Sequence, residues 1–214
     1  MDSLINFTMI LIILTDFWLL STSRLAACIK AVALQGMLLG LLLIMTHSGV
    51  IGSHVIIVCL LTVSIKGVAF PVLLKRTLKG INARREVQPY IGYSVSILAG
   101  IAGLLLSFWI GSRLPIPGPV VSTLAVPVAF STMLTGFFLI ISRRKALTQV
   151  IGYLVAENGI YAFGAAVVRD SSIWTEFGIL LDVLVGVFVM GIAIHHINNE
   201  FESIDVDRFT TLKD

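Results

Sequence analysis

The sequence contains few charged residues. Asp, Glu, Lys and Arg make up 13% of its 214 residues, about half the share found in soluble globular domains. Cysteine is also scarce, because Cys28 and Cys59 are the only two and both fall within long apolar runs. No cluster of Cys and His has metal-ligand spacing, so neither a structural disulfide nor a metal site is expected. The chain also lacks a glycine-rich phosphate loop, and its net charge of +3 gives no sign of nucleic-acid binding.

Apolar residues are abundant instead, at 57% of the chain. They form seven runs, each close to the ~20 residues of helix that cross a hydrocarbon core. The sequence therefore predicts an all-α integral membrane protein, with one domain of seven transmembrane helices over residues 1–197 and a cytoplasmic tail over residues 198–214. The predicted spans are Leu4–Leu20, Ala26–Thr46, Val50–Leu74, Tyr90–Ile110, Val120–Ile141, Leu147–Val168 and Trp174–Ile197.

The Lys and Arg residues between the spans predict the orientation of the helices. The first, third and fifth connections are rich in basic residues, whereas the second has none and the fourth and sixth have one each. Cytoplasmic loops are enriched in Lys and Arg, so the N-terminus should lie outside and the C-terminal tail inside. The basic loop Lys75–Pro89 fits this rule. A docking surface for a partner subunit or for anionic lipid is the alternative interpretation of the same charges.

Five ionisable residues fall within predicted spans: Asp16, Lys30, Lys66, Glu157 and Asp182. Each costs roughly 2.5–3.5 kcal/mol near the bilayer centre, so such groups usually face a helix bundle or a cavity. Asp16 and Lys30 lie at similar distances before and after the first hairpin turn. We expect them to form a structural ion pair near the cytoplasmic face, or Lys30 to extend its ammonium to the interface.

Lys66 lies deep in the third span, roughly 24 Å from its outer end at 1.5 Å per residue. Its long side chain could reach the cytoplasmic interface. However, Lys75 and Arg76 already mark that end, and Pro71 should loosen the helix one turn beyond Lys66. A lysine held in a poorly solvated bundle readily exists without its charge, which suits reversible protonation.

Glu157 and Asp182 are the strongest functional candidates. Both should lie near the midplane of the bilayer, on consecutive helices joined by a short outer loop. Tyr153, Glu157 and Tyr161 share one helix face at four-residue spacing, with Asn158 beside them. Burial favours the uncharged form of a carboxyl group, so each acid could take up and release a proton. The alternative is that both are buried acids that only make packing hydrogen bonds.

Several short motifs match a known family. The last three spans resemble the K-type small membrane subunit of respiratory complex I, a three-helix protein. The whole chain resembles its longer relative, component E of hydrogenase-4 and of related membrane-bound [NiFe]-hydrogenase complexes. The matching pieces are Arg143-Arg144 before the sixth span, Ile151-Gly152, Glu157-Asn158-Gly159, Asp182-x-x-x-Gly186 and the tail motif Ile204-Asp205-Val206-Asp207.

This resemblance implies a role for the two acids. Glu157 and Asp182 stand where the K-type subunit carries two intramembrane glutamates, which are regarded as links in a proton path. Two departures matter. Glu157 follows Gly152 by five residues rather than two, which keeps the helix face but shifts the depth. Asp182 replaces a glutamate, so its reach is shorter. Lys66 is a further candidate link, and Tyr153, Asn158 and Tyr161 would support the carboxyl groups.

The resemblance also implies the setting in which the chain works. It would be a non-catalytic subunit, without a cofactor, of an energy-converting hydrogenase complex in a prokaryotic cytoplasmic membrane. Its partners would be antiporter-like and quinone-subunit-like membrane chains and the hydrophilic [NiFe]-hydrogenase subunits. It would couple redox chemistry to the movement of H⁺ or Na⁺.

Two other functions stay open at this point. One is a free-standing secondary ion transporter, which a weak internal repeat at an offset of 120 residues would favour. The other is a purely structural membrane anchor for partner subunits. The anchor predicts that neutralising the intramembrane acids is harmless, whereas cutting the Lys75–Pro89 loop disrupts assembly.

Overall fold

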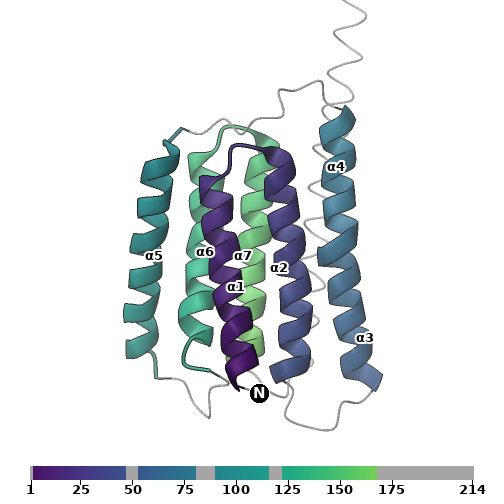
Figure 1. Ribbon diagram of the computed structural model, residues 1–214, viewed down its shortest axis with the longest axis vertical. Coiled ribbons are helices and arrows are strands. Elements are labelled where there is room, and N and C mark those ends of the chain that lie inside the picture. The colour runs from purple at the N-terminus through teal and green to yellow at the C-terminus, as the bar shows by residue number, and fades with distance from the viewer. Residues whose placement is uncertain (1, 47–52, 81–89, 116–121, 168–214) are drawn as a thin grey trace, which may run out of the picture.

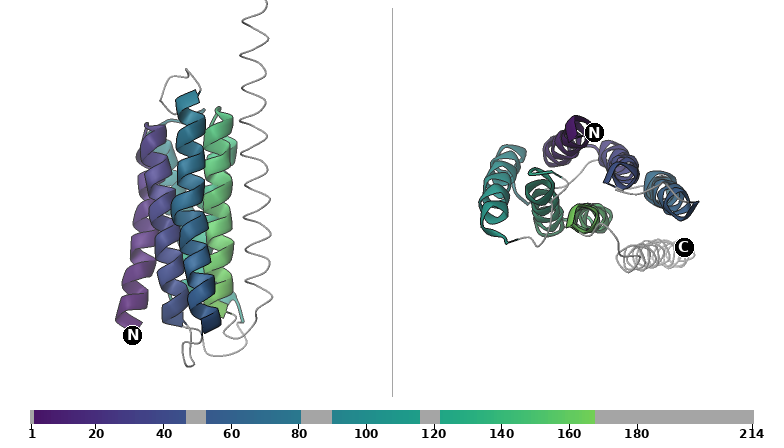
Figure 2. Two further views of the ribbon diagram at one scale, coloured as in Figure 1. Left: turned by 90° about the vertical axis from the view of Figure 1, so that its right-hand side faces the viewer. Right: turned by 90° about the horizontal axis from the view of Figure 1, so that it is seen from below.

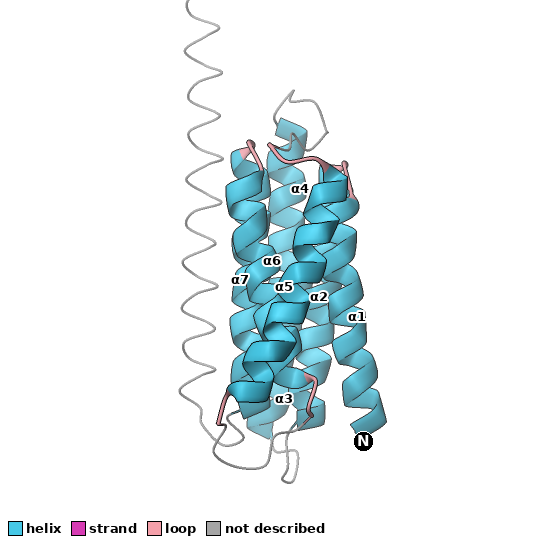
Figure 3. Cartoon of the chain, turned by 90° about the vertical axis from the view of Figure 1, so that its left-hand side faces the viewer, coloured by secondary structure: helices cyan, strands magenta, loops and turns pink. Residues whose placement is uncertain are grey.

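The computed structural model describes residues 2–46, 53–80, 90–115 and 122–167, and all of the regular structure in these ranges is helical (Figures 1 and 3). The predicted seventh span, Trp174–Ile197, and the tail lie outside the described residues. The elements in chain order are α1 (Asp2–Ser21), α2 (Leu25–Thr46), α3 (Ser53–Thr62), the π-helix η1 (Val63–Ala69), α4 (Phe70–Gly80), α5 (Tyr93–Arg113), α6 (Ala125–Ser142) and α7 (Ala146–Val167).

The helices run side by side as a bundle. In the end-on view of Figure 2, α1, α2 and the rod formed by α3, η1 and α4 stand in one row, and α6 and α7 face this row. The most extensive packing is between α6 and α7, while α2 contacts α1, η1 and α7, and α5 covers the outer side of α6 and α1. Helix α2 therefore packs against both the lysine-bearing rod and α7.

Each of the six predicted spans that fall on described residues is helical over most of its described length. Within the described ranges, four helices are long and apolar enough to cross a membrane: Ser3–Ser21, Leu25–Thr46, Tyr93–Arg113 and Ala125–Ser142. The predicted third span, Val50–Leu74, is the continuous rod from α3 to α4, which extends to Gly80. The total of seven spans and the inside–outside orientation remain predictions. The ends of α1, α4 and α6, which precede or carry the basic connections, lie at one end of the bundle (Figure 1).

The rod contains a π-helical segment around Lys66. Within η1 the helix widens, and the backbone N–H of Phe70 donates to the carbonyl of Ile65, five residues earlier. Pro71 follows directly and has no N–H to donate, so an α-helical hydrogen-bond ladder cannot continue through it. Such single π-helical turns often occur at functional sites. The loosening that Pro71 predicts is therefore present, as a π-helix that places Lys66 at its middle.

Apolar side chains on the outer faces are exposed, and those between the helices are buried. Large apolar residues of α5 point away from the bundle, including Leu98, Leu105 and Trp109. This distribution is expected of helices whose outer faces contact lipid tails or other membrane helices. Two buried apolar clusters fill the interior. One lies at the end where α6 turns into α7, and it joins α1, α2, α4, α6 and α7. The other lies at the opposite end and joins α1, α2, α6 and α7.

Candidate functional site

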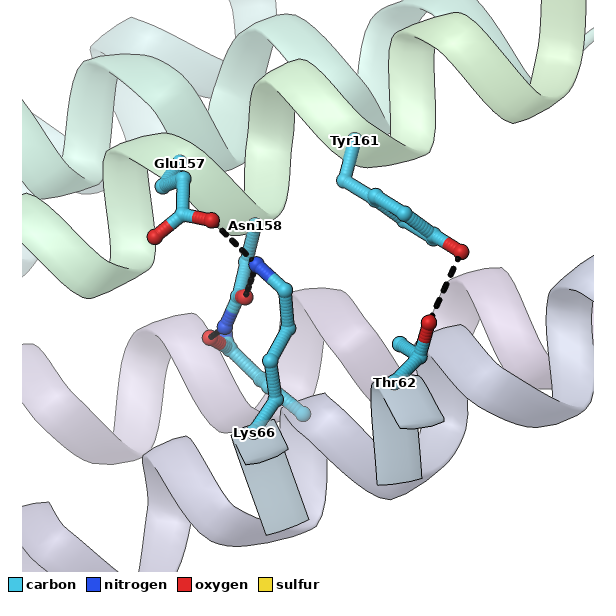
Figure 4. A network of polar contacts seen from close by, with 6 residues as sticks. Thr62, Lys66, Glu157, Asn158 and Tyr161 are labelled. Atoms are coloured by element: carbon cyan, nitrogen blue, oxygen red, sulfur yellow. Dashed lines mark hydrogen bonds and ion pairs between the residues drawn. The ribbon is translucent and has the colours of Figure 1, made fainter. Parts of the chain in front are cut away.

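A buried ion pair lies between the two apolar clusters. The ammonium nitrogen Nζ of Lys66 is 2.5 Å from the carboxylate oxygen Oε1 of Glu157, and each side chain is only 3% exposed. Figure 4 shows Lys66 reaching from the rod to α7, where Glu157 and Asn158 sit. The Lys66 ammonium also donates to Oδ1 of Asn158 at 3.4 Å. The alternative in which the Lys66 side chain reaches the cytoplasmic interface is not observed, because its ammonium is held inside the bundle.

The hydrogen bonds continue from Asn158 to a second carboxyl group. Asn158 donates from Nδ2 to Oε1 of Gln35 on α2, at 3.3 Å. Gln35 in turn donates from Nε2 to Oδ1 of Asp16 on α1, at 2.7 Å. The other oxygen of Asp16, Oδ2, is 2.8 Å from the hydroxyl of Thr132 on α6. One continuous network, called here the polar network, thus consists of Thr132, Asp16, Gln35, Asn158, Lys66 and Glu157.

The polar network is almost free of solvent contact. Gln35 and Thr132 are fully buried, and Asp16 and Asn158 are 2% and 3% exposed. A buried polar group without a hydrogen-bond partner costs a few kcal/mol, so networks of this kind persist when their members satisfy one another. The six side chains come from α1, α2, η1, α6 and α7. The network therefore links five helical elements to one another across the interior of the bundle.

Glycines on α2 allow the rod to bring Lys66 close. A Cβ added to Gly36 would lie 2.7 Å from Cβ of Lys66 and 2.8 Å from its carbonyl carbon, and one added to Gly40 would collide with Val63. The two glycines are four residues apart, the small-xxx-small spacing that lets membrane helices approach closely. The Lys66 backbone therefore lies directly against α2, and its side chain can pass beside Gln35 toward α7.

Glycines also set the contact between α6 and α7. A Cβ on Gly159 would lie 2.6 Å from the backbone nitrogen of Met133, and one on Gly152 would lie 2.8 Å from the carbonyl oxygen of Gly136. These contacts seat the α7 residues Glu157 and Asn158 against the middle of α6. The Ile151-Gly152 and Asn158-Gly159 pairs that mark the family resemblance therefore have a packing role in this chain.

The tyrosines of α7 differ in their contacts. The hydroxyl of Tyr161 lies 3.2 Å from that of Thr62, so the two share a hydrogen bond (Figure 4). The Lys66 ammonium lies 5.4 Å from the centre of the Tyr161 ring, within the range of a cation–π interaction. Tyr153 is half-buried and packs against an apolar cluster. The supporting role predicted for its hydroxyl stays a prediction.

The predicted ion pair between Asp16 and Lys30 is wrong. Asp16 accepts hydrogen bonds from Gln35 and Thr132, whereas Lys30 is exposed. Lys30 precedes Gln35 by five residues, which places the two about 140° apart around α2 at 3.6 residues per turn. Because Gln35 faces Asp16, Lys30 must point away from it. Equal distance from the hairpin turn set the depth of the two charges but not their direction.

Sequence reasoning missed two members of the polar network and could not place another candidate. Gln35 and Thr132 were not predicted, although an amide in the middle of the apolar run Leu25–Thr46 was a usable signal. Asp182, the predicted neighbour of Glu157, lies outside the described residues, so its role stays a prediction. Within the described ranges, no three His, Cys, Asp or Glu residues are grouped so that they could hold a metal ion.

The polar network is suited to holding and moving protons. It combines two carboxyl groups, one amine and two amides that each donate one hydrogen bond and accept another. In a membrane interior such groups mark ion or proton paths more often than they stabilise the fold. A buried ion pair contributes little net stability compared with apolar residues of similar size.

The sequences of known proteins give evidence about the family to which this chain is similar. The chain is 31% identical over 132 residues to the uncharacterized protein Rv0085 of Mycobacterium tuberculosis, a match that covers 62% of this chain and 60% of that protein. It is also 31% identical over 121 residues to hydrogenase-4 component E of Escherichia coli and of Shigella flexneri, covering 56% of this chain and 55% of theirs. No family model matches the chain, and no solved structure matches it significantly. The chain spans little more than half the length of these curated relatives. Over that stretch it is similar to hydrogenase-4 component E, as its motifs predict.

Proposed function

We propose that this chain is a non-catalytic membrane subunit of a hydrogenase-type energy-converting complex, and that Lys66 and Glu157 carry protons through it. The observation that supports the proposal most directly is the ion pair between them, at 2.5 Å and 3% exposure. An amine and a carboxyl group in direct contact can exchange a proton without water. The similarity to hydrogenase-4 component E supports the setting in a hydrogenase complex.

The chemistry of the pair is a reversible proton transfer. When a proton passes from Nζ of Lys66 to Oε1 of Glu157, one N–H bond breaks, one O–H bond forms, and the ion pair becomes a neutral pair. The net charge is zero on both sides of this step, so the surrounding apolar clusters do not oppose it strongly. Lys66 also lies in the middle of a π-helical turn, a feature that often occurs at functional sites.

The remaining parts of the proposal concern the partners. Antiporter-like and quinone-subunit-like membrane chains and hydrophilic [NiFe]-hydrogenase subunits are the proposed partners, in a prokaryotic cytoplasmic membrane. Asp182 on the predicted seventh span is proposed as the next acid along the path. Protons are the proposed ion rather than Na⁺, because an amine is a member of the pair and cannot coordinate a cation while it is protonated.

The decisive experiment uses membrane vesicles that contain the complete complex. Glu157→Gln and Lys66→Met, each made singly, should abolish proton uptake driven by redox turnover with hydrogen. Proton uptake is measured with a pH-sensitive dye, on complexes shown to be fully assembled. Lys30→Met is the matched control, because Lys30 is an intramembrane lysine that is exposed on the outer face of α2. Its proton uptake should equal that of the wild type.

Two outcomes would contradict the proposal. Undiminished proton uptake by correctly assembled Glu157→Gln complexes would leave only the structural-anchor function. Ion transport by the purified chain alone in liposomes would favour the free-standing transporter. Identification of the chains that co-purify with it from native membranes in mild detergent tests the proposed partners separately.

A further inference from the structure

The two buried amides of the polar network have a defined orientation. An amide side chain carries an oxygen that accepts hydrogen bonds and an NH₂ group that donates them. Asn158 presents its oxygen to the Lys66 ammonium at 3.4 Å (Figure 4), and its NH₂ group to Oε1 of Gln35 at 3.3 Å. Turning the amide over would exchange the two groups without changing its shape. The orientation of Asn158 therefore decides whether Lys66 meets an acceptor or a donor.

Asp16 determines how Gln35 is turned. Gln35 donates from Nε2 to Oδ1 of Asp16 at 2.7 Å, the shortest of the three hydrogen bonds that lead from Lys66 to Asp16. Thr132 donates to the other oxygen at 2.8 Å, so both oxygens of Asp16 accept. Because the NH₂ group of Gln35 is directed at Asp16, its oxygen faces Asn158. Asn158 must then donate to Gln35 and direct its own oxygen at Lys66.

Burial couples the two amides to one another. Gln35 is fully buried, and Asp16 and Asn158 are 2% and 3% exposed. A buried N–H group or oxygen without a partner is costly, and bulk water does not reach these groups to replace a lost partner. Each amide can therefore turn over only if its neighbour turns as well. Asp16, Gln35 and Asn158 thus form an amide relay, in which the orientation set at Asp16 is passed to Asn158.

The lysine end of the network favours the same orientation only while Lys66 is charged. An ammonium group has three N–H donors and no acceptor, so it favours the oxygen of Asn158. After the proposed transfer of a proton to Glu157, the neutral amine carries a lone pair and can accept as well as donate. Asn158 could then turn over and donate to it. The transfer leaves Asp16 unchanged, so the amide relay still holds the oxygen of Asn158 in place.

We propose that Asp16 is a positioning residue for the proton exchange between Lys66 and Glu157. Acting through Gln35 and Asn158, it keeps a hydrogen-bond acceptor directed at Lys66 before and after the transfer. In the return step the O–H bond of Glu157 breaks, an N–H bond of Lys66 forms, and the waiting acceptor stabilises the positive charge as it develops. This inference rests on the proposed function and adds α1 and α2 to the elements that serve the exchange.

Rates of proton uptake by vesicles that contain the complete, assembled complex test the inference. Asp16→Leu and Gln35→Met roughly keep the size of the side chain and break the amide relay at two different points. Each should lower the rate about threefold to tenfold, the effect of losing one net hydrogen bond to the charged form. Asp16→Asn should stay within about twofold of the wild type, because its carbonyl oxygen still accepts from Gln35 and its NH₂ group can donate to the Thr132 hydroxyl.

A double-mutant cycle shows whether Asp16 acts through Asn158. Asn158→Leu removes the amide that the relay orients, and it should lower the rate by a similar factor. Asp16→Leu should cause no further loss in the Asn158→Leu background, because no acceptor is left to be positioned. Two independent structural defects would instead multiply their effects on the rate. If Asp16→Leu does not assemble, Gln35→Met takes its place in the cycle.

Ser107→Ala is the control for loss of a buried hydrogen bond elsewhere in the bundle. The fully buried Ser107 donates to the carbonyl of Gly103 within α5, so Ser107→Ala should take up protons at the wild-type rate. With Glu157→Gln inactive, three results would each overturn the inference alone: wild-type rates in Asp16→Leu and Gln35→Met, equal losses in Asp16→Asn and Asp16→Leu, or multiplied effects in the cycle. Undiminished uptake by Glu157→Gln complexes would instead overturn the proposed function, and with it the inference.

Discussion

Removing one partner of the Lys66–Glu157 ion pair should be far more damaging than removing both. Glu157→Gln takes away the carboxylate that lies 2.5 Å from the Lys66 ammonium, while both side chains remain buried from solvent. Breaking a buried ion pair in this way costs about 3–5 kcal/mol, whereas replacing the whole pair with uncharged residues of similar size is often neutral. We therefore expect Glu157→Gln to lower the free energy of unfolding by about 3 kcal/mol. Lys66→Met combined with Glu157→Gln should lie within about 1 kcal/mol of the wild type.

The measurement is unfolding of the purified chain by a denaturing detergent in mixed micelles, followed by tryptophan fluorescence. Lys30→Met serves as the control for removal of a lysine, and it should change stability by less than about 0.5 kcal/mol because Lys30 is exposed. The reasoning would be refuted if the double variant were less stable than Glu157→Gln alone, because the pair would then not be the source of the penalty.

Two further predictions concern how Lys66 is seated. Gly36→Ala should lower stability by about 1–3 kcal/mol in the same unfolding assay, because its new Cβ would lie 2.7 Å from Cβ of Lys66. Gly103→Ala is the control and should be tolerated, because its new Cβ would lie 3.8 Å from the nearest atom. Equal effects of the two substitutions would contradict the close packing of α2 against Lys66. Tyr161→Phe and Thr62→Val should each lower stability by about 0.5–1.5 kcal/mol by breaking their shared 3.2 Å hydrogen bond. Their effects should not add in the double variant, and full additivity would show that the hydroxyls do not interact.

The positions of the helices could largely be predicted from the sequence, and the reason is physical. A backbone in hydrocarbon must satisfy its hydrogen bonds within each span, so an apolar run of sufficient length has few alternatives to a helix. The predicted spans Leu4–Leu20 and Ala26–Thr46 differ from α1 and α2 by one or two residues. The π-helical turn was not predicted as such, because it depends on the combined effect of Pro71 and the close contact with α2.

The pairing of the charges was harder to predict than their depth. Lys66 and Glu157 are 91 residues apart in the sequence, and nothing in either helix alone specifies that they face one another. Depth follows from counting residues along a helix, and it correctly marked both as deeply placed groups. Direction around the helix depends on which neighbour packs on which face. That information is missing from a single span, so Asp16 was paired with Lys30 instead of Gln35.

Small residues carry the missing directional information, and they could have been used. Gly36 and Gly40 lie on one face of α2, and the rod packs on that face because only there can its backbone approach closely. Gln35 neighbours Gly36 in the sequence, just as Asn158 neighbours Gly159, so each amide stands beside a glycine that seats another helix. A polar residue next to such a glycine is directed into a helix–helix contact rather than toward lipid. In an apolar span, an amide adjacent to a packing glycine therefore predicts a buried polar network even where no second charge is nearby.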